Sequence, residues 1–167
     1  MPSMRATRYM LWLVLAVVLL GLDLWTKELA SQNLDLYRPL AVTGWLNLTL
    51  AHNEGAAFSF LAGAGGWQRW FFTAVALLVS AVLLVWLKRL PQGARLLPVA
   101  IVMVLAGALG NMIDRIRHGH VVDFIDIHYQ GWHWPAFNVA DSVIVIGVVL
   151  LLLEGFIPRR EPGPGPR

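Results

Sequence analysis

The sequence predicts an all-α membrane protein with four transmembrane helices. Of its 167 residues, 57% are hydrophobic and 14% are charged, whereas soluble domains contain about 45–50% apolar and about 25% charged residues. The apolar residues are concentrated in four long runs, each approaching the roughly 20 residues that a spanning helix requires. We therefore expect one integral-membrane domain, residues 1–157, followed by a disordered Pro- and Gly-rich tail, residues 158–167.

The four apolar runs predict spans at about 9–26, 70–87, 96–113 and 139–157. The first run resembles a secretory signal peptide because Arg5 and Arg8 precede it. No A-x-A-like cleavage site follows, so we interpret it as a retained span. Its apolar stretch is short, which means that the helix must continue through Asp23 or begin before Tyr9.

The basic residues predict the orientation of the spans. Lys and Arg gather before the first span, between the second and third, and after the fourth, as Arg5, Arg8, Lys88, Arg89, Arg95, Arg159, Arg160 and Arg167. Because cytoplasmic segments carry an excess of Lys and Arg, both termini are expected in the cytoplasm. The net charge of +3 thus indicates orientation in a membrane rather than binding to nucleic acid. The long loops 23–69 and 114–138 then face outward.

The outer loops contain signals for extended structure. Leu46, Leu48 and Leu50 alternate with polar or small residues, which predicts a short, half-buried strand. The aromatic segment 127–134 is expected to be a further strand or an interfacial loop, since Trp and Tyr prefer the membrane surface.

Asp123 and Asp141 are the most unusual residues of the chain. Asp123 lies between Val122 and Phe124, and Asp141 lies about two residues into the fourth run. Ionisable residues at such positions are functional-site candidates by default. Two carboxylates close together share a proton, so one can activate water while the other protonates a carbonyl oxygen. Alternatively, Asp123 is a solvated loop carboxylate and Asp141 a helix cap, although Asn138 lies nearer the helix boundary.

Two further groups of polar residues flank the first span and the outer turn. Asp23 and Lys27 are four residues apart and share a helix face, either as a functional pair or as a surface ion pair worth a few tenths of a kcal/mol. Asn53 and Gly55 belong to a turn. The Asn amide both donates and accepts, which suits it to hold a peptide main chain.

A third group lies at the end of the third run. Asn111 and Arg115 are four residues apart and face the same way. Arg115 can bind a carboxylate or phosphate through two parallel hydrogen bonds. It could equally pair with Asp114 or with a lipid headgroup.

Other site chemistries have weaker support. The chain has no cysteine, which excludes disulfides and thiolate chemistry. A metal site is conceivable among the histidines of the third loop, but no H-E-x-x-H motif is present, and we predict no metal or other cofactor. Ser142 lacks the G-x-S-x-G turn of a serine nucleophile. A four-span transporter should carry polar residues at mid-membrane, where the second and fourth runs are aliphatic apart from Ser80. A non-catalytic membrane scaffold would not require two aspartates at one depth.

Five motifs in order resemble bacterial lipoprotein signal peptidase, also called signal peptidase II. They are D-x-x-[ST]-K at Asp23–Lys27, N-x-G-x-[AS]-F at Asn53–Phe58, G-N-x-x-D-R at Gly110–Arg115, V-[VI]-D-[FM] at Val121–Phe124 and F-N-x-A-D-[ST] at Phe137–Ser142. Each motif alone is weak, whereas five in sequence order are specific.

The resemblance implies an aspartic endopeptidase of the bacterial inner membrane with its active site at the periplasmic face. Its implied substrate is a prolipoprotein with a diacylglyceryl group on the cysteine, and cleavage occurs just before that cysteine. It further implies a small extracytoplasmic β-sheet cradle and a short surface helix. We expect contact with membrane lipids, no nucleic-acid partner and a monomer. Asp123 and Asp141 match the catalytic pair, and the supporting positions are Asp23, Lys27, Asn53, Gly55, Asn111, Arg115 and Asn138.

Overall fold

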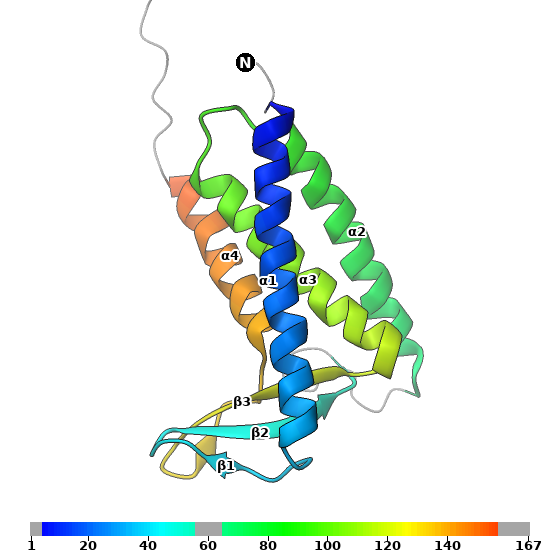
Figure 1. The fold of residues 1–167 in the computed structure, drawn as a ribbon, viewed down its shortest axis with the longest axis vertical. Coiled ribbons are helices and arrows are strands. Elements are labelled where there is room, and N and C mark those ends of the chain that lie inside the picture. The colour runs from blue at the N-terminus through cyan, green and yellow to red at the C-terminus, as the bar shows by residue number, and fades with distance from the viewer. Residues whose placement is uncertain (1–4, 56–64, 157–167) are drawn as a thin grey trace, which may run out of the picture.

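The computed structural model describes residues 5–55 and 65–156. Its helices are α1 (Ala6–Asn33), α2 (Trp67–Arg89), α3 (Leu96–His118) and α4 (Val139–Phe156). Its strands are β1 (Leu40–Ala41), β2 (Leu46–Asn53), β3 (Val121–Tyr129) and β4 (Trp132–His133). Each of the 4 helices is long and apolar enough to cross a membrane, which confirms the predicted fold class (Figure 1).

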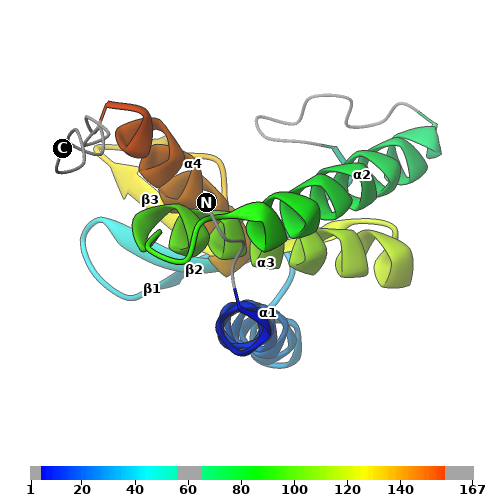
Figure 2. The same ribbon diagram turned by 90° about the horizontal axis from the view of Figure 1, so that it is seen from above.

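The third helix is the centre of the bundle. Seen along the bundle, α3 packs against α1, α2 and α4, which lie around it (Figure 2). The core between α1, α2 and α3 is apolar and includes the buried side chains of Leu87, Ile101 and Leu105. Many Leu and Val side chains on the outer faces of α1, α2 and α4 are exposed. Such apolar faces are expected where lipid, rather than water, surrounds a helix.

Small residues bring α3 and α4 together. A side chain on Gly107 would meet the carbonyl oxygen of Ala140 and the side chain of Ile144. A Cβ on Gly147 would lie 2.7 Å from Cγ2 of Val104. Close approach through small residues is the usual way in which membrane helices gain packing energy. It also fixes the start of α4 against the second half of α3.

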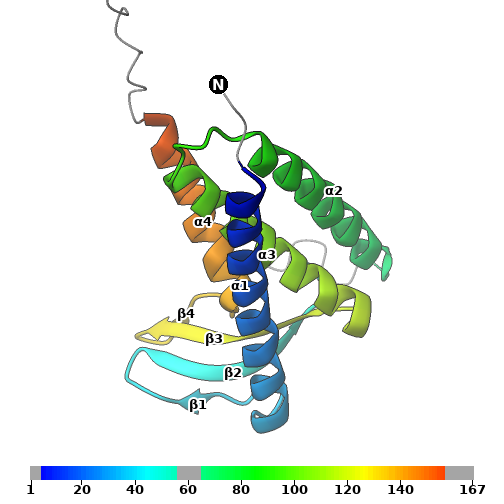
Figure 3. The same cartoon turned by 45° about the horizontal axis from the view of Figure 1, so that its top comes forward.

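The strands form one antiparallel sheet in the order β1-β2-β3-β4 at the end of the bundle opposite to the beginning of α1 and the end of α4 (Figures 1 and 3). The pairing of β2 with β3 runs from Leu46 opposite Ile127 to Asn53 opposite Val121, with an irregularity between Leu48 and Ala51. The sheet confirms the predicted strand near residues 46–50 and extends it to Asn53.

Several boundaries differ from the sequence-based expectation. α1 begins before Tyr9 and also continues well past residue 26, because the polar residues in its second half have buried partners. The segment containing Asp123 is strand β3 rather than a solvated loop. Among residues 5–55 and 65–156 the helices are α1–α4, so the implied surface helix is not found there. The predicted tail and the end of the Asn53–Phe58 motif lie outside the described residues.

Candidate active site

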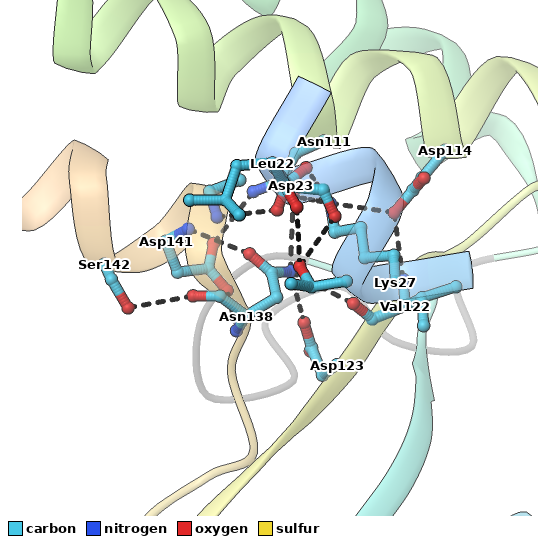
Figure 4. A network of polar contacts seen from close by, with 12 residues as sticks. Leu22, Asp23, Lys27, Asn111, Asp114, Val122, Asp123, Asn138, Asp141 and Ser142 are labelled. Carbon is cyan, nitrogen blue, oxygen red and sulfur yellow. Dashed lines mark hydrogen bonds and ion pairs between the residues drawn. The ribbon is translucent and has the colours of Figure 1, made fainter. Parts of the chain in front are cut away.

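The predicted site residues meet where the sheet joins the bundle, and Figure 4 shows Asp23, Lys27, Asn111, Asp123, Asn138 and Asp141 among them. Five elements or their flanks contribute to this cluster. The contributions are Asp23 and Lys27 from α1, Asn53 from β2, Asn111, Asp114 and Arg115 from α3, Asp123 from β3, and Asn138 and Asp141 from the start of α4.

Lys27 is the centre of a buried ionic group. Its Nζ lies 2.8 Å from Oδ2 of Asp23 and 2.9 Å from Oδ2 of Asp114. It also donates a hydrogen bond of 2.9 Å to Oδ1 of Asn111. An ammonium group has three donors, and here each has an acceptor. The Lys27 side chain is 4% exposed, so the alternative of a surface ion pair is wrong.

The two acidic partners of Lys27 also bind main-chain groups. Oδ1 of Asp23 accepts a hydrogen bond of 2.7 Å from the N–H of Ala140, in the first turn of α4. Oδ2 of Asp114 accepts one of 3.1 Å from the N–H of Val122 in β3. The ionic group therefore connects α1 and α3 to the two elements that carry the proposed carboxylate pair. Sequence reasoning missed the role of Asp114, which is adjacent to Arg115 and was considered only as its ion-pair partner.

Asn138 caps α4 and bridges the two carboxylates. Its Oδ1 accepts a 2.9 Å hydrogen bond from the N–H of Asp141, while its own N–H donates to Oδ2 of Asp141 at 3.3 Å. This reciprocal pattern is a capping box. Its Nδ2 donates to Oδ1 of Asp123 at 2.7 Å. Asn138 thus holds the two carboxylates in a fixed relation, through its side-chain Nδ2 to Asp123 and its main-chain N–H to Asp141, and the cap assignment to Asn138 is confirmed.

Three amide side chains are locked so that their N–H groups face the carboxylates. The oxygens of Asn138, Asn53 and Asn111 each accept from a group that can only donate. These donors are the N–H of Asp141, the N–H of Gly55 at 3.0 Å and Nζ of Lys27. An amide whose oxygen is occupied in this way must present its nitrogen on the other side.

The amide nitrogens of Asn53 and Asn111 donate to the other oxygens of the two carboxylates. Asn53 Nδ2 donates to Oδ2 of Asp123 at 3.1 Å. Asn111 Nδ2 donates to Oδ1 of Asp141 at 2.8 Å. Both oxygens of each carboxylate therefore accept an N–H group. The orientation of each amide follows from its donor-only partner, which is a local main-chain N–H for Asn53 and Asn138 and the distant Lys27 for Asn111.

Asp123 has an environment that favours its protonated form. Its side chain lies in β3 and is almost fully buried, with 2% of the residue exposed. Burial, and after it the charge of Asp141, raises the pKa of the Asp123 carboxyl from 3.8 to about 7. The amide hydrogen bonds from Asn53 and Asn138 lower it, but burial outweighs them. Near neutral pH this carboxyl can therefore hold or release a proton.

Arg115 closes one side of the cluster. Its Nη2 donates a 2.8 Å hydrogen bond to the carbonyl oxygen of Gly55, and its Nη1 donates to the carbonyl oxygen of Asn111 at 3.2 Å. The guanidinium carbon lies 5.1 Å from the centroid of the Phe72 ring. These hydrogen bonds go to main-chain carbonyl oxygens and not to the carboxylate of Asp114, which was one of the expected partners. Arg115 instead anchors the turn that orients Asn53.

The carboxylates open into a pocket of about 860 Å³. Asp123, Asp141, Asn53 and Arg115 line it on the polar side. Its remaining wall is largely apolar and comes from α4, from β2 and β3, and from the segment that precedes α4. The volume lies within the range of about 300–1,000 Å³ typical of ligand sites.

A second buried carboxylate of β3 lies outside this pocket. Asp126 accepts hydrogen bonds from Asn47 at 3.0 Å and Thr49 at 3.3 Å, and its Oδ1 lies 2.8 Å from Nδ1 of His133. Burial alone would raise its pKa, but these contacts outweigh burial and lower the pKa of Asp126. Across residues 5–55 and 65–156, no three His, Asp or Glu side chains are grouped in a way that could hold a metal ion.

Known proteins resemble the chain over nearly its whole length. Residues 15–157 match the family model described as signal peptidase (SPase) II. The lipoprotein signal peptidase of Acinetobacter baumannii is 53% identical over 152 residues, which is 91% of this chain and 86% of that protein. The lipoprotein signal peptidase of Ectopseudomonas mendocina is 52% identical over 158 residues, which is 93% and 94% of the two chains. A solved bacterial membrane enzyme structure, obtained by the in meso method at 2.3 Å resolution, superposes with a TM-score of 0.80 at 32% identity and covers 97% of both chains.

Proposed function

Because the chain belongs to the signal peptidase II family and is a peptidase of the bacterial membrane, we propose that it removes the signal peptide from prolipoproteins. The substrate carries a diacylglyceryl group on its cysteine, and the peptide bond just before that cysteine is hydrolysed. The observation that carries the proposed chemistry is the pair Asp123 and Asp141, bridged by Asn138 at the wall of the pocket.

The proposed reaction uses one proton shared by the two carboxyls. Asp141 takes a proton from water as the water oxygen attacks the scissile carbonyl carbon, and Asp123 gives its proton to the carbonyl oxygen. In the resulting gem-diol, a hydroxyl proton returns to Asp123 while Asp141 protonates the leaving nitrogen. The C–N bond then breaks, and both carboxyls return to their starting state. The raised pKa of Asp123 supports its role as the protonated partner at neutral pH.

The surrounding residues are proposed to position the pair. Asn53, Asn111 and Asn138 direct N–H groups at the carboxylates, so each oxygen has a fixed direction. Lys27, with Asp23, holds Asn111 and the first turn of α4 in place. Through Gly55, Arg115 fixes the turn that orients Asn53, and its cation lies beside the pocket, where it offsets negative charge during the reaction.

We further propose that the protein lies in the inner membrane with the sheet at the periplasmic face. The bundle end opposite the sheet carries the beginning of α1, the α2–α3 link and the end of α4 (Figure 1). The basic residues Lys88, Arg89 and Arg95 belong to that end, as expected for cytoplasmic segments. The site then lies at the level of the outer headgroups, where both water and a lipid-bearing chain are present. The protein is proposed to act as a monomer in contact with membrane lipids, with no cofactor.

Purified protein in detergent, incubated with a diacylglyceryl-modified prolipoprotein, tests the proposal. We expect cleavage, detected as a mass shift, by the wild type and its loss in Asp123→Asn and Asp141→Asn. Asp126→Asn is the matched control, since Asp126 is buried in the same strand but outside the pocket. Cleavage by either pair variant would remove that residue from the mechanism. Loss of wild-type activity with a chelator would contradict metal-free chemistry.

A further inference from the structure

Tyr37, in the segment between α1 and β1, has an unusual backbone conformation. Its φ of 58° lies in the left-handed region, which a residue with a bulky side chain rarely adopts. The segment is held against β2 at Tyr37 and at the residue that precedes it. The N–H of Tyr37 donates to the carbonyl oxygen of Leu50 at 2.8 Å, and Leu36 forms a β-bridge with the same Leu50. The conformation is therefore imposed by main-chain contacts.

This arrangement does not bury the aromatic ring of Tyr37. Tyr37 is 63% exposed and lines the pocket that contains both carboxylates. A left-handed backbone is unfavourable for tyrosine, and an exposed ring recovers little of that cost by packing. Glycine would occupy the same backbone conformation without strain. Strained residues that face a pocket are characteristic of ligand-binding positions, so the ring is best explained by contact with something that enters the pocket.

The two ends of the pocket differ in their surroundings. Ile144, Val145 and Ile146 line it along α4, which is one of the candidate membrane spans. Tyr37 and Trp134 line it from the sheet side. Asp141 also lines the pocket, from the first turn of α4. A substrate whose scissile bond reaches the carboxylates therefore extends from a helix-lined end to a sheet-lined end.

We infer that Tyr37 is a positioning residue that contacts the substrate segment following the lipidated cysteine. This inference rests on the proposed function. The signal peptide is apolar and belongs with the membrane-spanning helices, so it occupies the α4 end of the pocket. The chain on the other side of the scissile bond is polar and leaves over the sheet, where Tyr37 lies. A tyrosine ring packs against an extended peptide, and its hydroxyl can bond to the main chain.

Steady-state cleavage of two substrates tests the inference. One is a full-length diacylglyceryl prolipoprotein, and the other is truncated directly after the lipidated cysteine. We expect Tyr37→Gly to raise KM for the full-length substrate by about 5–10-fold, in the range of one substantial contact. The truncated substrate should be cleaved as by the wild type. Tyr37→Phe keeps the ring but loses the hydroxyl, so it should raise KM for the full-length substrate by less than Tyr37→Gly does.

Gln130→Gly is the matched control. Gln130 also has a positive φ, of 49°, but it lies in the β3–β4 turn and does not line the pocket. We expect this variant to cleave both substrates normally. Wild-type kinetics of Tyr37→Gly on both substrates, or an equal loss on both, would overturn the inference while leaving the peptidase function intact. If the wild type cleaves neither substrate, the proposed function fails and the inference fails with it.

Discussion

Replacing Asp123 by Asn should abolish cleavage and, above neutral pH, make the protein more stable. The folded state raises the pKa of Asp123 from 3.8 to about 7 through burial and the charge of Asp141. The stability associated with this carboxyl is present below its unfolded pKa of 3.8 and is lost as the pH rises through its folded pKa of about 7. At pH 8 the wild type therefore carries an unfavourable buried charge that the variant lacks.

The size of this stability difference follows from the change in the pKa of Asp123 on folding. A change of about 3 pKa units corresponds to about 4 kcal/mol at pH 8, because each unit is worth about 1.4 kcal/mol. At pH 5, only about one of these three pKa units contributes, which corresponds to an unfavourable free energy of about 1–2 kcal/mol. The new amide faces N–H donors from Asn53 and Asn138, so Asn also carries a mismatch of about 1–3 kcal/mol. That mismatch is independent of pH. The stability of Asp123→Asn relative to the wild type should therefore increase by about 2–3 kcal/mol between pH 5 and pH 8.

Thermal unfolding in detergent at pH 5 and pH 8 measures this difference. About 2–3 kcal/mol corresponds to a Tm difference of about 5–10 °C for a protein of this size. The Tm of Asp123→Asn relative to wild type should therefore rise by that amount between the two pH values. Asp126→Asn should lower the Tm at both, because the pKa of Asp126 is depressed and its charge is stabilising. An Asp123→Asn effect that is the same at pH 5 and pH 8 would refute a strongly raised pKa.

Three further predictions concern the same cluster. Gly110→Ala should lower stability by about 1–3 kcal/mol and also reduce cleavage, because its Cβ would meet the Asp23 carboxylate. Gly21→Ala should change neither, since its Cβ would meet nothing outside the backbone of its own helix within 4 Å. Equal effects of the two variants in unfolding and cleavage assays would contradict this. Lys27→Met should lower the free energy of unfolding by about 3–5 kcal/mol, since it leaves two buried carboxylates without their cation; a Tm near that of the wild type would show that the ionic group contributes little. Cleavage should slow above pH 7 as Asp123, with its pKa of about 7, loses its proton, and a rate independent of pH from 6 to 9 would exclude it as the acid.

The sequence predicted the helices well because a span is a local property. Long apolar runs and the distribution of Lys and Arg are visible without any tertiary contact. The strand around Leu46–Leu50 was also visible from its alternation. β3 was not predicted around Asp123, because two aspartates interrupt a stretch of Val, Phe and Ile that otherwise favours a strand.

Sequence analysis predicted the residues of the candidate site but not the contacts between them. Local spacing placed Asp23 and Lys27 on one helix face, yet their burial depends on Asp114, which is far along the chain. The signal that could have found Asp114 is its position three residues after Asn111, on a neighbouring face of α3. The proximity of Asp123 and Asp141 depends on Asn138, and no periodicity in the sequence encodes such a contact.

The capping box at the start of α4 also has a consequence for biosynthesis. Asp123 is synthesised before the fourth span, whereas Asp141 and Asn138 become ordered only when α4 has formed and docked on α3. A chain with three spans in the membrane therefore has one carboxyl of the proposed pair and lacks both its partner and the amide that bridges them. Hydrolysis by the proposed pair would be latent until α4 is inserted and docked, so neighbouring membrane proteins are not exposed to it while the protein is being made.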